Sequence, residues 1–507
     1  MNVSVVDANG TQVTMAMADF AALLAAAAPA ADLASARALD TFYTLIGAFL
    51  VFFMQVGFCF LEVGCVHAKN TKNILVKNIL DACIAAISFY FVGYAFGFLG
   101  GNGFIGSSGF VFHDAAYDVA PADPLGRLYN GKAYAAWLFQ WAFAATASTI
   151  VTGAVAERIS FWAYISYAVL LTAFIYPVVV HWLWSPTGFA SATNVTKLLF
   201  GVGAVDFAGS GVIHMTGGMA ALVGCYILGP RIGRFEGGKP CDMPKQSVFL
   251  QTIGTLLLWF GWYGFNCMST GTLTGTSADV AAKVAVNLTL AAAAASIGCV
   301  FLGAVTGDRI VDPVMANNGV LSGAVAITAG CAVVEPSGAV VIGLVAAVLY
   351  TFSSKGLVAC GIDDVVDAVP VHLVCGIWGV LAPGFFASST GMQMAFAHDS
   401  CGVFYGCANG GKQLGAQMVV VLSIMAWVGL TCTILFLTLF QFNLLRVSPE
   451  TELAGLDLSL HGGPAYEQGD DVKMTGPKTE NSLNDSGFHQ VMTPATANGA
   501  SIAFNSV

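Results

Sequence analysis

Apolar runs of 18 or more residues recur along the chain, separated by shorter polar segments. Each run is long enough to cross a lipid bilayer as a helix, which takes about 20 residues. The pattern predicts eleven spans, at residues 41–63, 78–100, 133–154, 160–182, 208–228, 247–267, 279–302, 318–334, 337–354, 365–386 and 416–441. We therefore expect an all-α polytopic membrane protein.

The composition supports this class. Only 9% of the 507 residues are charged and 57% are hydrophobic, whereas soluble domains carry about 25% charged residues. The net charge of -10 says little about partners, because most acidic residues lie in loops and tails. No basic block suggests nucleic-acid binding. The 13 cysteines show no metal-binding spacing, but Cys401 and Cys407 share a polar loop and could form a disulfide if that loop faces outside.

The basic residues of the loops predict the orientation, because cytoplasmic loops are richer in Lys and Arg. One set of loops holds ten of them: Lys69, Lys72, Lys77, Arg158, Arg231, Arg234, Lys239, Lys245, Arg309 and Lys355. The opposite set holds five: Arg127, Lys132, Lys197, Lys283 and Lys412. The first set is therefore assigned to the cytoplasm.

With eleven spans, the N-terminus is then outside and the C-terminus inside. We expect an extracellular segment at 1–40, an eleven-helix domain at 41–442 and a cytoplasmic tail at 443–507. Ten of the spans form two sets of five, and the second odd-numbered set must be inverted relative to the first. Transporters with this architecture place their sites near the midplane, between the halves.

Two histidines stand out because each follows an aspartate at the beginning of an apolar span. His214 comes eight residues after Asp206, at the outer end of the fifth span. His372 comes eight residues after Asp364, at the inner end of the tenth. Eight helical residues rise about 12 Å, and the hydrocarbon core is about 30 Å thick. We therefore expect the two imidazoles to approach the midplane from opposite sides.

Ionisable residues within spans are usually functional, although a single histidine can also serve as a hydrogen-bonding residue between helices. Two histidines at matched depth in the membrane favour a functional role. They make a poor metal site without a third ligand, whereas neutral imidazoles suit proton handling or hydrogen bonding. We expect no metal, no other cofactor and no enzymatic activity.

Aromatic residues gather in "LFQWAF", "HWLW" and "LWFGWYGFN". Each cluster alone is weak evidence, since Trp and Tyr populate membrane interfaces. Trp184 is more informative because it ends the fourth span on the outer side. An indole face there attracts a cation by about 0.5–2 kcal/mol.

Five segments together resemble the ammonium transporter family (Amt/Mep/Rh): "AWLFQWAFAATASTIVTGAVAERISF", "GAVDFAGSGVIHMTGGMAALVG", "WFGWYGFNCMST", "VDAVPVHLVCGIWGVLAPGFFA" and "LDLSLHGGPAYE". The resemblance runs from about residue 40 to 467 and covers every predicted span in order. It implies an Amt-type protein with eleven helices, in two inverted five-helix repeats plus a last helix. It also implies a homotrimer with one pore per subunit.

The resemblance assigns an outer ammonium recruitment site to Phe139, Trp184 and Ser269. Trp184 would supply the π face and Ser269 a hydroxyl acceptor. Asp206 resembles the buried acid that supports this site without touching the ion.

Further in, Phe143 and Phe265 resemble the stacked rings that close the outer mouth. His214 and His372 resemble the paired pore histidines, and Trp262 a pore-lining indole.

The sequence departs from the family pattern beside the second histidine. Leu373 stands where the family usually has Gly, and Pro370 precedes His372 by two residues. Proline frees a backbone carbonyl and can kink a helix. We therefore expect any unusual pore geometry to lie around His372.

An apolar pore discriminates by charge. Stripping water from an ammonium ion costs tens of kcal/mol in an apolar medium, and neutral ammonia costs far less. Such a pore favours loss of a proton at the mouth and excludes potassium, which cannot shed its charge. Net ammonium transport is favoured because Trp184, Asp206 and Ser269 are all present.

The C-terminal segment "ETELAGLDLSLHGGPAYE" resembles the family's cytoplasmic regulatory tail. Ser459 stands where plant-like members carry a phosphorylatable Thr, which suggests a kinase as a partner; it could equally be an ordinary helix or turn residue. A phosphate adds about -1.5 to -2 charges. Residues beyond 467 have a composition typical of disorder.

The leading hypothesis is a plasma-membrane transporter of ammonium and methylammonium, in contact with membrane lipid. One alternative is an ammonium sensor, or transceptor, that signals through the tail; the absence of a folded signalling domain in the tail disfavours it. A neutral-gas channel of Rhesus type is disfavoured by Trp184 and Asp206, which that branch typically lacks.

Overall fold

The computed structural model describes residues 2–6, 12–113, 130–307 and 309–466, with side chains from Asp32 onward. Met1–Ala465 belongs to one compact unit, and only Tyr466 of the second unit, Tyr466–Val507, is described. The tail that we expect to be disordered therefore lies outside the described residues.

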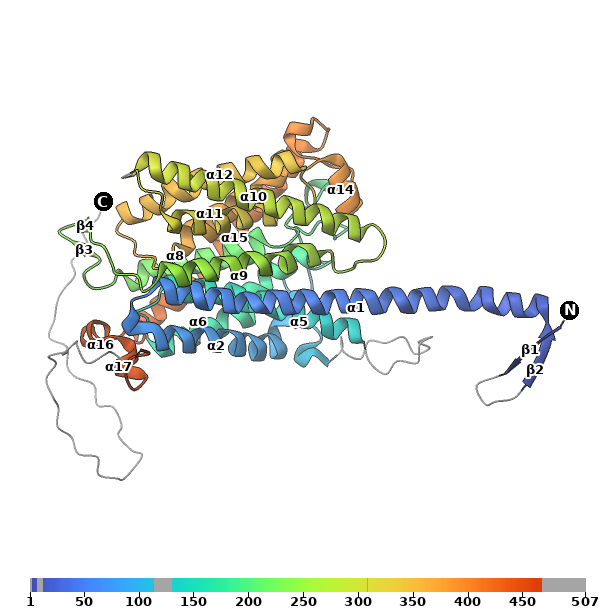
Figure 1. Ribbon diagram of the computed structural model, residues 1–507, viewed down its shortest axis with the longest axis horizontal. Coiled ribbons are helices and arrows are strands. Elements are labelled where there is room, and N and C mark those ends of the chain that lie inside the picture. Colours follow the sequence, from blue (N-terminus) through green and yellow to red (C-terminus); the bar gives the residue numbers. More distant parts are fainter. Residues whose placement is uncertain (1, 7–11, 114–129, 308, 467–507) are drawn as a thin grey trace, which may run out of the picture. The chain divides into compact units, whose positions relative to one another are not determined.

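Helices make up almost all of the described elements (Figure 1). In chain order these are β1 (Asn2–Val6), β2 (Gln12–Ala16), α1 (Met17–Cys65), η1 (Ala68–Asn70), α2 (Thr71–Ser88), η2 (Phe89–Gly93), α3 (Tyr94–Phe98), η3 (Phe110–Phe112), α5 (Gly131–Ala154), α6 (Phe161–Leu170), η4 (Leu171–Ile175), α7 (Tyr176–Trp184), η5 (Leu199–Gly201), η6 (Ser210–Met215), α8 (Thr216–Leu228), β3 (Phe235–Glu236), β4 (Lys239–Pro240), α9 (Val248–Cys267), η7 (Met268–Thr270), α10 (Ser277–Thr306), α11 (Pro313–Thr328), α12 (Pro336–Ala359), η8 (Val369–Val374), α13 (Cys375–Phe386), α14 (Ser389–Phe396), η9 (Val403–Tyr405), α15 (Gly410–Gln441), α16 (Pro449–Ala454) and α17 (Leu456–Leu460). The strands pair as two antiparallel hairpins, β1 with β2 and β3 with β4.

Nine helical segments among the described residues are long and apolar enough to cross a membrane. They are Asp32–Cys65, Ala68–Phe98, Phe161–Trp184, Ser210–Leu228, Val248–Thr270, Ser277–Thr306, Pro336–Ala359, Val369–Phe386 and Gly410–Gln441. The prediction of a multi-pass all-α membrane protein is confirmed. The count of eleven stays a prediction.

The two remaining predicted spans are also helical, as α5 and α11. α11 has only 16 residues, and α5 has 24 but carries several Thr and Ser residues. Residues 142–154 of α5 and 317–328 of α11 are all buried. A helix surrounded by other helices does not face lipid, so it tolerates a lower hydropathy than a peripheral span.

The sequence also determines where these helices start. Asn130, Ser160 and Ser247 each accept a hydrogen bond from a backbone N–H in the first turn of α5, α6 and α9 respectively. Asp312 does the same for α11. Such caps satisfy donors that a helix leaves free at its N-terminus.

Close helix packing builds the bundle. α1 lies beside α9, and α10, α11 and α12 pack against one another (Figure 1). At Gly254 of α9, an added Cβ would lie 2.4 Å from the backbone nitrogen of Leu61. Small residues that let backbones approach are typical of helix contacts in membranes.

Several basic residues that we counted in loops lie inside helices: Lys72 and Lys77 in α2, Lys355 in α12, Lys132 in α5, Lys283 in α10 and Lys412 in α15. Lys77, counted above in a cytoplasmic loop, lies inside α2 and is only 1% exposed. The loop assignment of Lys77 was wrong because the helix begins at Thr71, before the apolar run that marked the expected span. Without the buried Lys77, the nine other residues of that set still outnumber the five on the opposite side.

Candidate functional site

A cavity of about 510 Å³ is lined by Phe139, Trp184, Asp206 and Ser269, together with polar residues that include Lys132. We call it the Trp184 cavity. The indole Nε1 of Trp184 donates to the Asp206 carbonyl at 2.7 Å, which fixes the ring orientation. The Ser269 hydroxyl donates to the Phe265 carbonyl at 2.7 Å, so its oxygen keeps lone pairs for another donor. The structure thus brings the four predicted recruitment residues together.

Asp206 also holds the backbone of the segment that follows it in the chain. Its carboxylate accepts from the backbone N–H groups of Gly209, Gly211 and Val212 at 3.0, 2.9 and 2.8 Å. The residue is 4% exposed. Burial raises the pKa of Asp206 to about 6, although these backbone donors act in the opposite direction. The acid therefore fixes the start of the segment that carries His214.

The aromatic pair at the base of the cavity differs from our expectation. The rings of Phe143 and Phe265 have centroids 4.3 Å apart and meet edge to face, at 83°. The prediction of stacked rings was wrong, because an edge-to-face contact suits the quadrupoles of two benzene rings better than a parallel sandwich. Phe143 also contacts Phe139 edge to face at 4.6 Å. Phe143 and Phe265 are both fully buried.

The predicted meeting of the two imidazoles is confirmed. His214 Nδ1 and His372 Nδ1 lie 3.1 Å apart, and the ring planes differ by 17°. One Nδ1 must donate and the other accept, so the two rings hold complementary tautomers. Both residues are buried, at 0% and 5% exposure. By contrast, His181 bonds the carbonyls of Gly97 and Asn102, as a hydrogen-bonding residue between helices would.

Aromatic rings surround His214. Its ring stacks on Phe265 at 5.5 Å and on Trp262 at 5.3 Å. The Trp262 indole donates to the Thr328 hydroxyl at 3.1 Å, so its polar edge is satisfied within the protein. Within the described part of the chain, His214 Nε2 has no hydrogen-bond partner. An imidazole nitrogen that can still form a hydrogen bond thus lies among apolar side chains.

The two histidine segments share one local construction. His214 lies in the π-helical turn η6 and His372 in the π-helical turn η8. Asp364 accepts from the backbone N–H of Val369 at 2.7 Å, as Asp206 does for η6. Pro370 lies within the first two positions of η8, where a backbone N–H would have no partner within the helix. The unusual geometry expected around His372 therefore occurs at His214 as well.

The segments also touch through their backbones. A Cβ added at Gly218 of α8 would lie 2.4 Å from the backbone nitrogen of Leu373. The departure from the family pattern at Leu373 is tolerated because its backbone, with a glycine opposite, makes this contact. The side chain of Leu373 is itself buried.

The sequence model of the Ammonium Transporter Family matches residues 42–466. The chain belongs to this family. It is 40% identical over 449 residues to ammonium transporter 1 member 3 of Solanum lycopersicum, a match that covers 85% of this chain and 93% of the relative. It is 43% identical over 426 residues to ammonium transporter 1 member 2 of Arabidopsis thaliana, covering 80% of each.

Solved structures agree with this assignment. A protein named "Sensor Amt Protein" superimposes with a TM-score of 0.73 at 32% identity, over 84% of this chain and 98% of that one. Candida albicans Mep2 gives a TM-score of 0.70 at 26% identity, over 81% and 87%. The fold of this ammonium transporter family member is thus shared with experimentally determined members of the family.

Two further cavities lie beyond the histidine pair. Along α5, Phe139 lines the Trp184 cavity, Phe143 meets Phe265, and Ile150 lines a small cavity of about 20 Å³ with His372 and Glu62. We call this the Glu62 cavity. Because α5 rises about 16 Å between residues 139 and 150, the two cavities lie on opposite sides of the histidines.

A third cavity of about 210 Å³, the Arg231 cavity, is lined by Arg231, Arg234, Asp364 and Asp367 among others. Asp206 thus borders a cavity on one side and Asp364 a cavity on the other. The segments η6 and η8 therefore enter the bundle from opposite sides, as the inverted halves predict.

The tail packs against the N-terminal end of α2. The Asp457 carboxylate accepts from the backbone N–H groups of Lys72 and Asn73, both at 2.9 Å. Lys69 Nζ donates to the carbonyls of Glu452 and Leu453. Ser459 lies on α17, is exposed, and donates to the Gly455 carbonyl at 3.0 Å.

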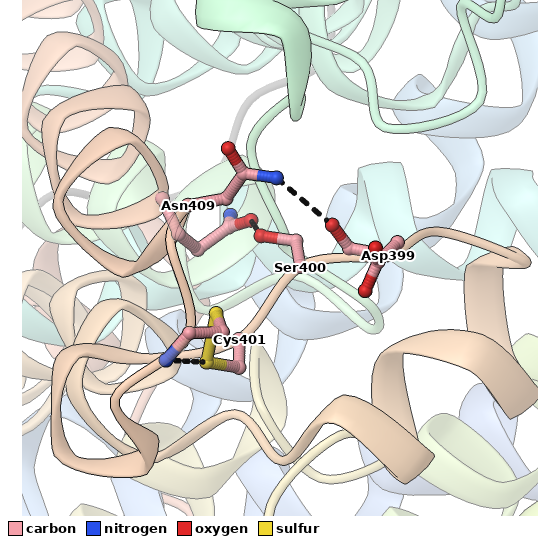
Figure 2. Close-up of a disulfide and its surroundings, with 6 residues drawn as sticks. Asp399, Ser400, Cys401 and Asn409 are labelled. Carbon is pink, nitrogen blue, oxygen red and sulfur yellow. Dashed lines mark hydrogen bonds between the residues drawn. A yellow bond between two sulfur atoms is a disulfide. The ribbon is translucent and has the colours of Figure 1, made fainter.

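Cys401 and Cys407, whose pairing the sequence left open, form a disulfide (Figure 2). The backbone N–H of Cys407 lies 3.3 Å from the Cys401 sulfur. Ser400 donates to Gln413, and Asn409 donates to the Asp399 carbonyl, so the same loop is also held by hydrogen bonds (Figure 2).

Sequence reasoning missed a buried polar cluster formed by Glu62, Lys77 and Asp81, which are at most 1% exposed. The rule that marked the histidines would have found Glu62, a lone acid in the apolar run "FCFLEVG". Lys77 and Asp81 lie near the expected start of a span, where loop and membrane residues are hard to separate. In the part of the chain described here, no group of His, Cys, Asp and Glu residues is arranged to hold a metal.

Proposed function

We propose that this protein transports ammonium across the plasma membrane by recruiting the cation, removing its proton and conducting ammonia through an apolar passage. The order of groups along α5 carries the proposal: the Trp184 cavity, the phenylalanine pair and the histidine pair follow one another. The names of the relatives, which are ammonium transporters, support the substrate.

Recruitment requires a site that favours a cation over water. The Trp184 face supplies a cation–π contact, Phe139 adds a second aromatic wall, and the Ser269 oxygen accepts an N–H of ammonium. Asp206 adds negative charge from the wall of the cavity, while its carboxylate bonds backbone N–H groups and not the ion. Several side chains with hydroxyl or amide groups also line the cavity and can bond the ion.

Conduction requires loss of the charge, since the passage beyond Phe143 and Phe265 is closed by aromatic rings. Ammonia crosses this apolar stretch at far lower cost than ammonium. His214 and His372 offer nitrogen atoms that bond the ammonia along the path, and Trp262 shapes the wall. The paired imidazoles also provide a route for the proton, which makes net ammonium transport our preferred outcome.

The same proposal includes the assembly and its control. We infer a homotrimer in the lipid bilayer, with the N-terminus outside and the tail in the cytoplasm. Phosphorylation of Ser459 by a cellular kinase would add charge to α17, next to the contact between Asp457 and α2. The tail would then regulate the pore from the cytoplasmic side.

The test is uptake of labelled methylammonium together with current in proteoliposomes. Wild-type protein should show both, and His214→Ala should lower uptake at least about tenfold because the dry path loses a hydrogen-bonding partner. His398→Ala, which removes an imidazole bonded to the Val202 carbonyl outside the pore, is the matched control. Absence of uptake by wild-type protein would refute the proposal.

A second candidate is an ammonium sensor that transports poorly, because one similar structure is that of a protein named "Sensor Amt Protein". Wild-type protein that binds ammonium with no labelled uptake would favour this role. Uptake with no accompanying charge would instead favour a neutral-gas channel.

A further inference from the structure

Glu62 lies where a proton leaving the histidine pair would next arrive. It belongs to the last turn of α1, is 1% exposed and lines the Glu62 cavity together with His372. The cavity has a volume of about 20 Å³, which suffices for one water molecule. His372 and Glu62 are its two ionisable lining residues, and the others are apolar.

A larger cavity with charged lining residues, the Arg231 cavity, begins one helical turn further on. Cys65, three residues after Glu62, lines the Arg231 cavity together with Asp364 and Asp367. Val366 lines the Glu62 cavity, whereas its neighbours Val365 and Asp367 line the Arg231 cavity. One layer of side chains thus separates the two spaces, and Glu62 lies at that layer.

Glu62 and Asp81 are both buried acids, but Glu62 has fewer hydrogen-bond donors to stabilise a negative charge. Asp81 accepts hydrogen bonds from Ser148 and Thr152 at 2.9 and 2.6 Å and a longer one from Tyr164. Three hydroxyl donors stabilise a carboxylate. Glu62 accepts only the Asn78 amide, at 2.7 Å, among the hydrogen bonds described for its side chain.

Lys77 supplies the one cation of this cluster. Its Nζ is buried, has no hydrogen-bond partner among the described residues, and lies 5.7 Å from the Tyr164 ring centroid. One lysine ammonium compensates one of the two carboxylates. Since Asp81 has the better donors, the second, uncompensated acid is Glu62, and a buried uncompensated carboxylate binds a proton readily.

We propose that Glu62 is the proton acceptor on the inner side of the histidine pair. This inference rests on the proposed function and assigns its last step. A protonated His372 gives its N–H proton to a water in the Glu62 cavity, and that water gives one of its own protons to the Glu62 carboxylate. The carboxyl then releases the proton to water in the Arg231 cavity, where it recombines with ammonia. No bond other than N–H and O–H changes, and one positive charge crosses with each ammonia.

The experiment uses full-length protein in proteoliposomes and measures current and labelled methylammonium uptake on the same preparation. Glu62→Gln keeps the side-chain volume and an acceptor for Asn78 but cannot take up the proton. We expect the charge moved per labelled molecule to fall at least about tenfold, since a positioned acid or base contributes about 100-fold or more to proton transfer. The KM for methylammonium should stay unchanged because the Trp184 cavity lies on the opposite side of the histidine pair from Glu62.

Two variants separate this role from a structural one. Glu62→Asp retains a carboxyl and should recover most of the current. Asp279→Asn, which removes an exposed acid from the first turn of α10, should leave the ratio of charge to substrate unchanged.

An unchanged ratio in Glu62→Gln would overturn the assignment of Glu62 while leaving ammonium transport intact. Loss of uptake and current together, in Glu62→Gln and Glu62→Asp alike, would overturn it by indicating a structural role. Wild-type uptake without current would overturn both Glu62 and net ammonium transport, and no wild-type uptake would overturn the proposed function itself.

Discussion

Replacing Asp206 tests the proposed connection between the recruitment site and the histidine segment. Asp206→Ala removes an acceptor from three buried backbone N–H groups. Each donor left unsatisfied costs about 1–3 kcal/mol, so the sum is about 3–9 kcal/mol. Whole proteins are stable by only about 5–15 kcal/mol. The alanine variant is therefore expected to fold poorly, and Asp206→Asn is the informative change.

Asparagine keeps one oxygen and the side-chain volume. Placed so that the oxygen faces Gly211 and Val212, it loses the bond to Gly209 and the negative charge. Two unit charges 4 Å apart interact by about 4 kcal/mol at an effective dielectric constant of 20. A cation within about 8 Å of the carboxylate would thus lose about 2 kcal/mol or more, which corresponds to a roughly 30-fold rise in the KM for ammonium.

The pH dependence gives an independent reading of the same group. Because burial raises the pKa of Asp206 to about 6, lowering the external pH through 6 neutralises the carboxylate and should weaken uptake in the wild type. The native protein, in contrast, gains stability from this proton: the contribution is complete below the ordinary pKa of 3.8 and is lost as pH rises through about 6. Uptake and stability should therefore move in opposite directions between pH 7 and 5.

The assay is initial-rate uptake of labelled methylammonium in proteoliposomes, with the external pH varied and the internal pH held. The Asp206→Asn variant should have a high KM that does not change between external pH 7 and 5. Asp399→Asn, which alters an exposed carboxyl in the disulfide loop, is the matched control. An Asp206→Asn variant with wild-type KM and a wild-type pH profile would refute the electrostatic role of Asp206.

Other predictions concern the inner loops, the disulfide and the tail. Arg231→Gln leaves Asp363 and Glu157 buried without the cation that bonds both, so we expect about 3–5 kcal/mol of destabilisation, seen as a lower thermal unfolding midpoint in detergent; an unchanged midpoint would contradict it. Burial alone would raise the pKa of Asp363, but hydrogen bonds from Arg231 and the charges of Arg158 and Arg231 lower it to about 2, and the stability from these contacts should be lost only as pH falls below about 4. Cys401→Ser opens a bridge between residues six apart and should cost about 2 kcal/mol by loop entropy, measured the same way against the reduced wild type, which should behave alike. Ser459→Asp should lower uptake several-fold relative to Ser459→Ala, and equal uptake by the two would exclude a charge switch at this position.

The histidine pair was predictable because imidazoles are rare in apolar spans and because eight residues of helix from either side reach a similar depth. The mutual orientation of Phe143 and Phe265 was not, since spacing along two separate helices does not fix the angle between two rings. No shared sequence signal predicted the two π-helical turns, because η8 contains Pro370 but η6 contains no proline.

Charged residues near span ends were the other source of error. Lys77 was assigned to a loop, and Asp81 and Glu62 were passed over, because hydropathy cannot tell a snorkelling charge from one enclosed by neighbouring helices. Their burial depends on partners from α5 and α6, such as Thr152 and Tyr164, which are distant in sequence. Tertiary contacts of this kind can be found only once the helices are assembled.

The close approach of Gly218 to Leu373 has a consequence for how the passage can respond to stress. Main chain meets main chain at this contact, so no change of side-chain rotamer can move η8 away from α8. Separating the two segments would require the two halves to part as rigid blocks, against all the contacts between them. The two halves should therefore keep a fixed spacing here, and any control by the tail must act on another part of the passage.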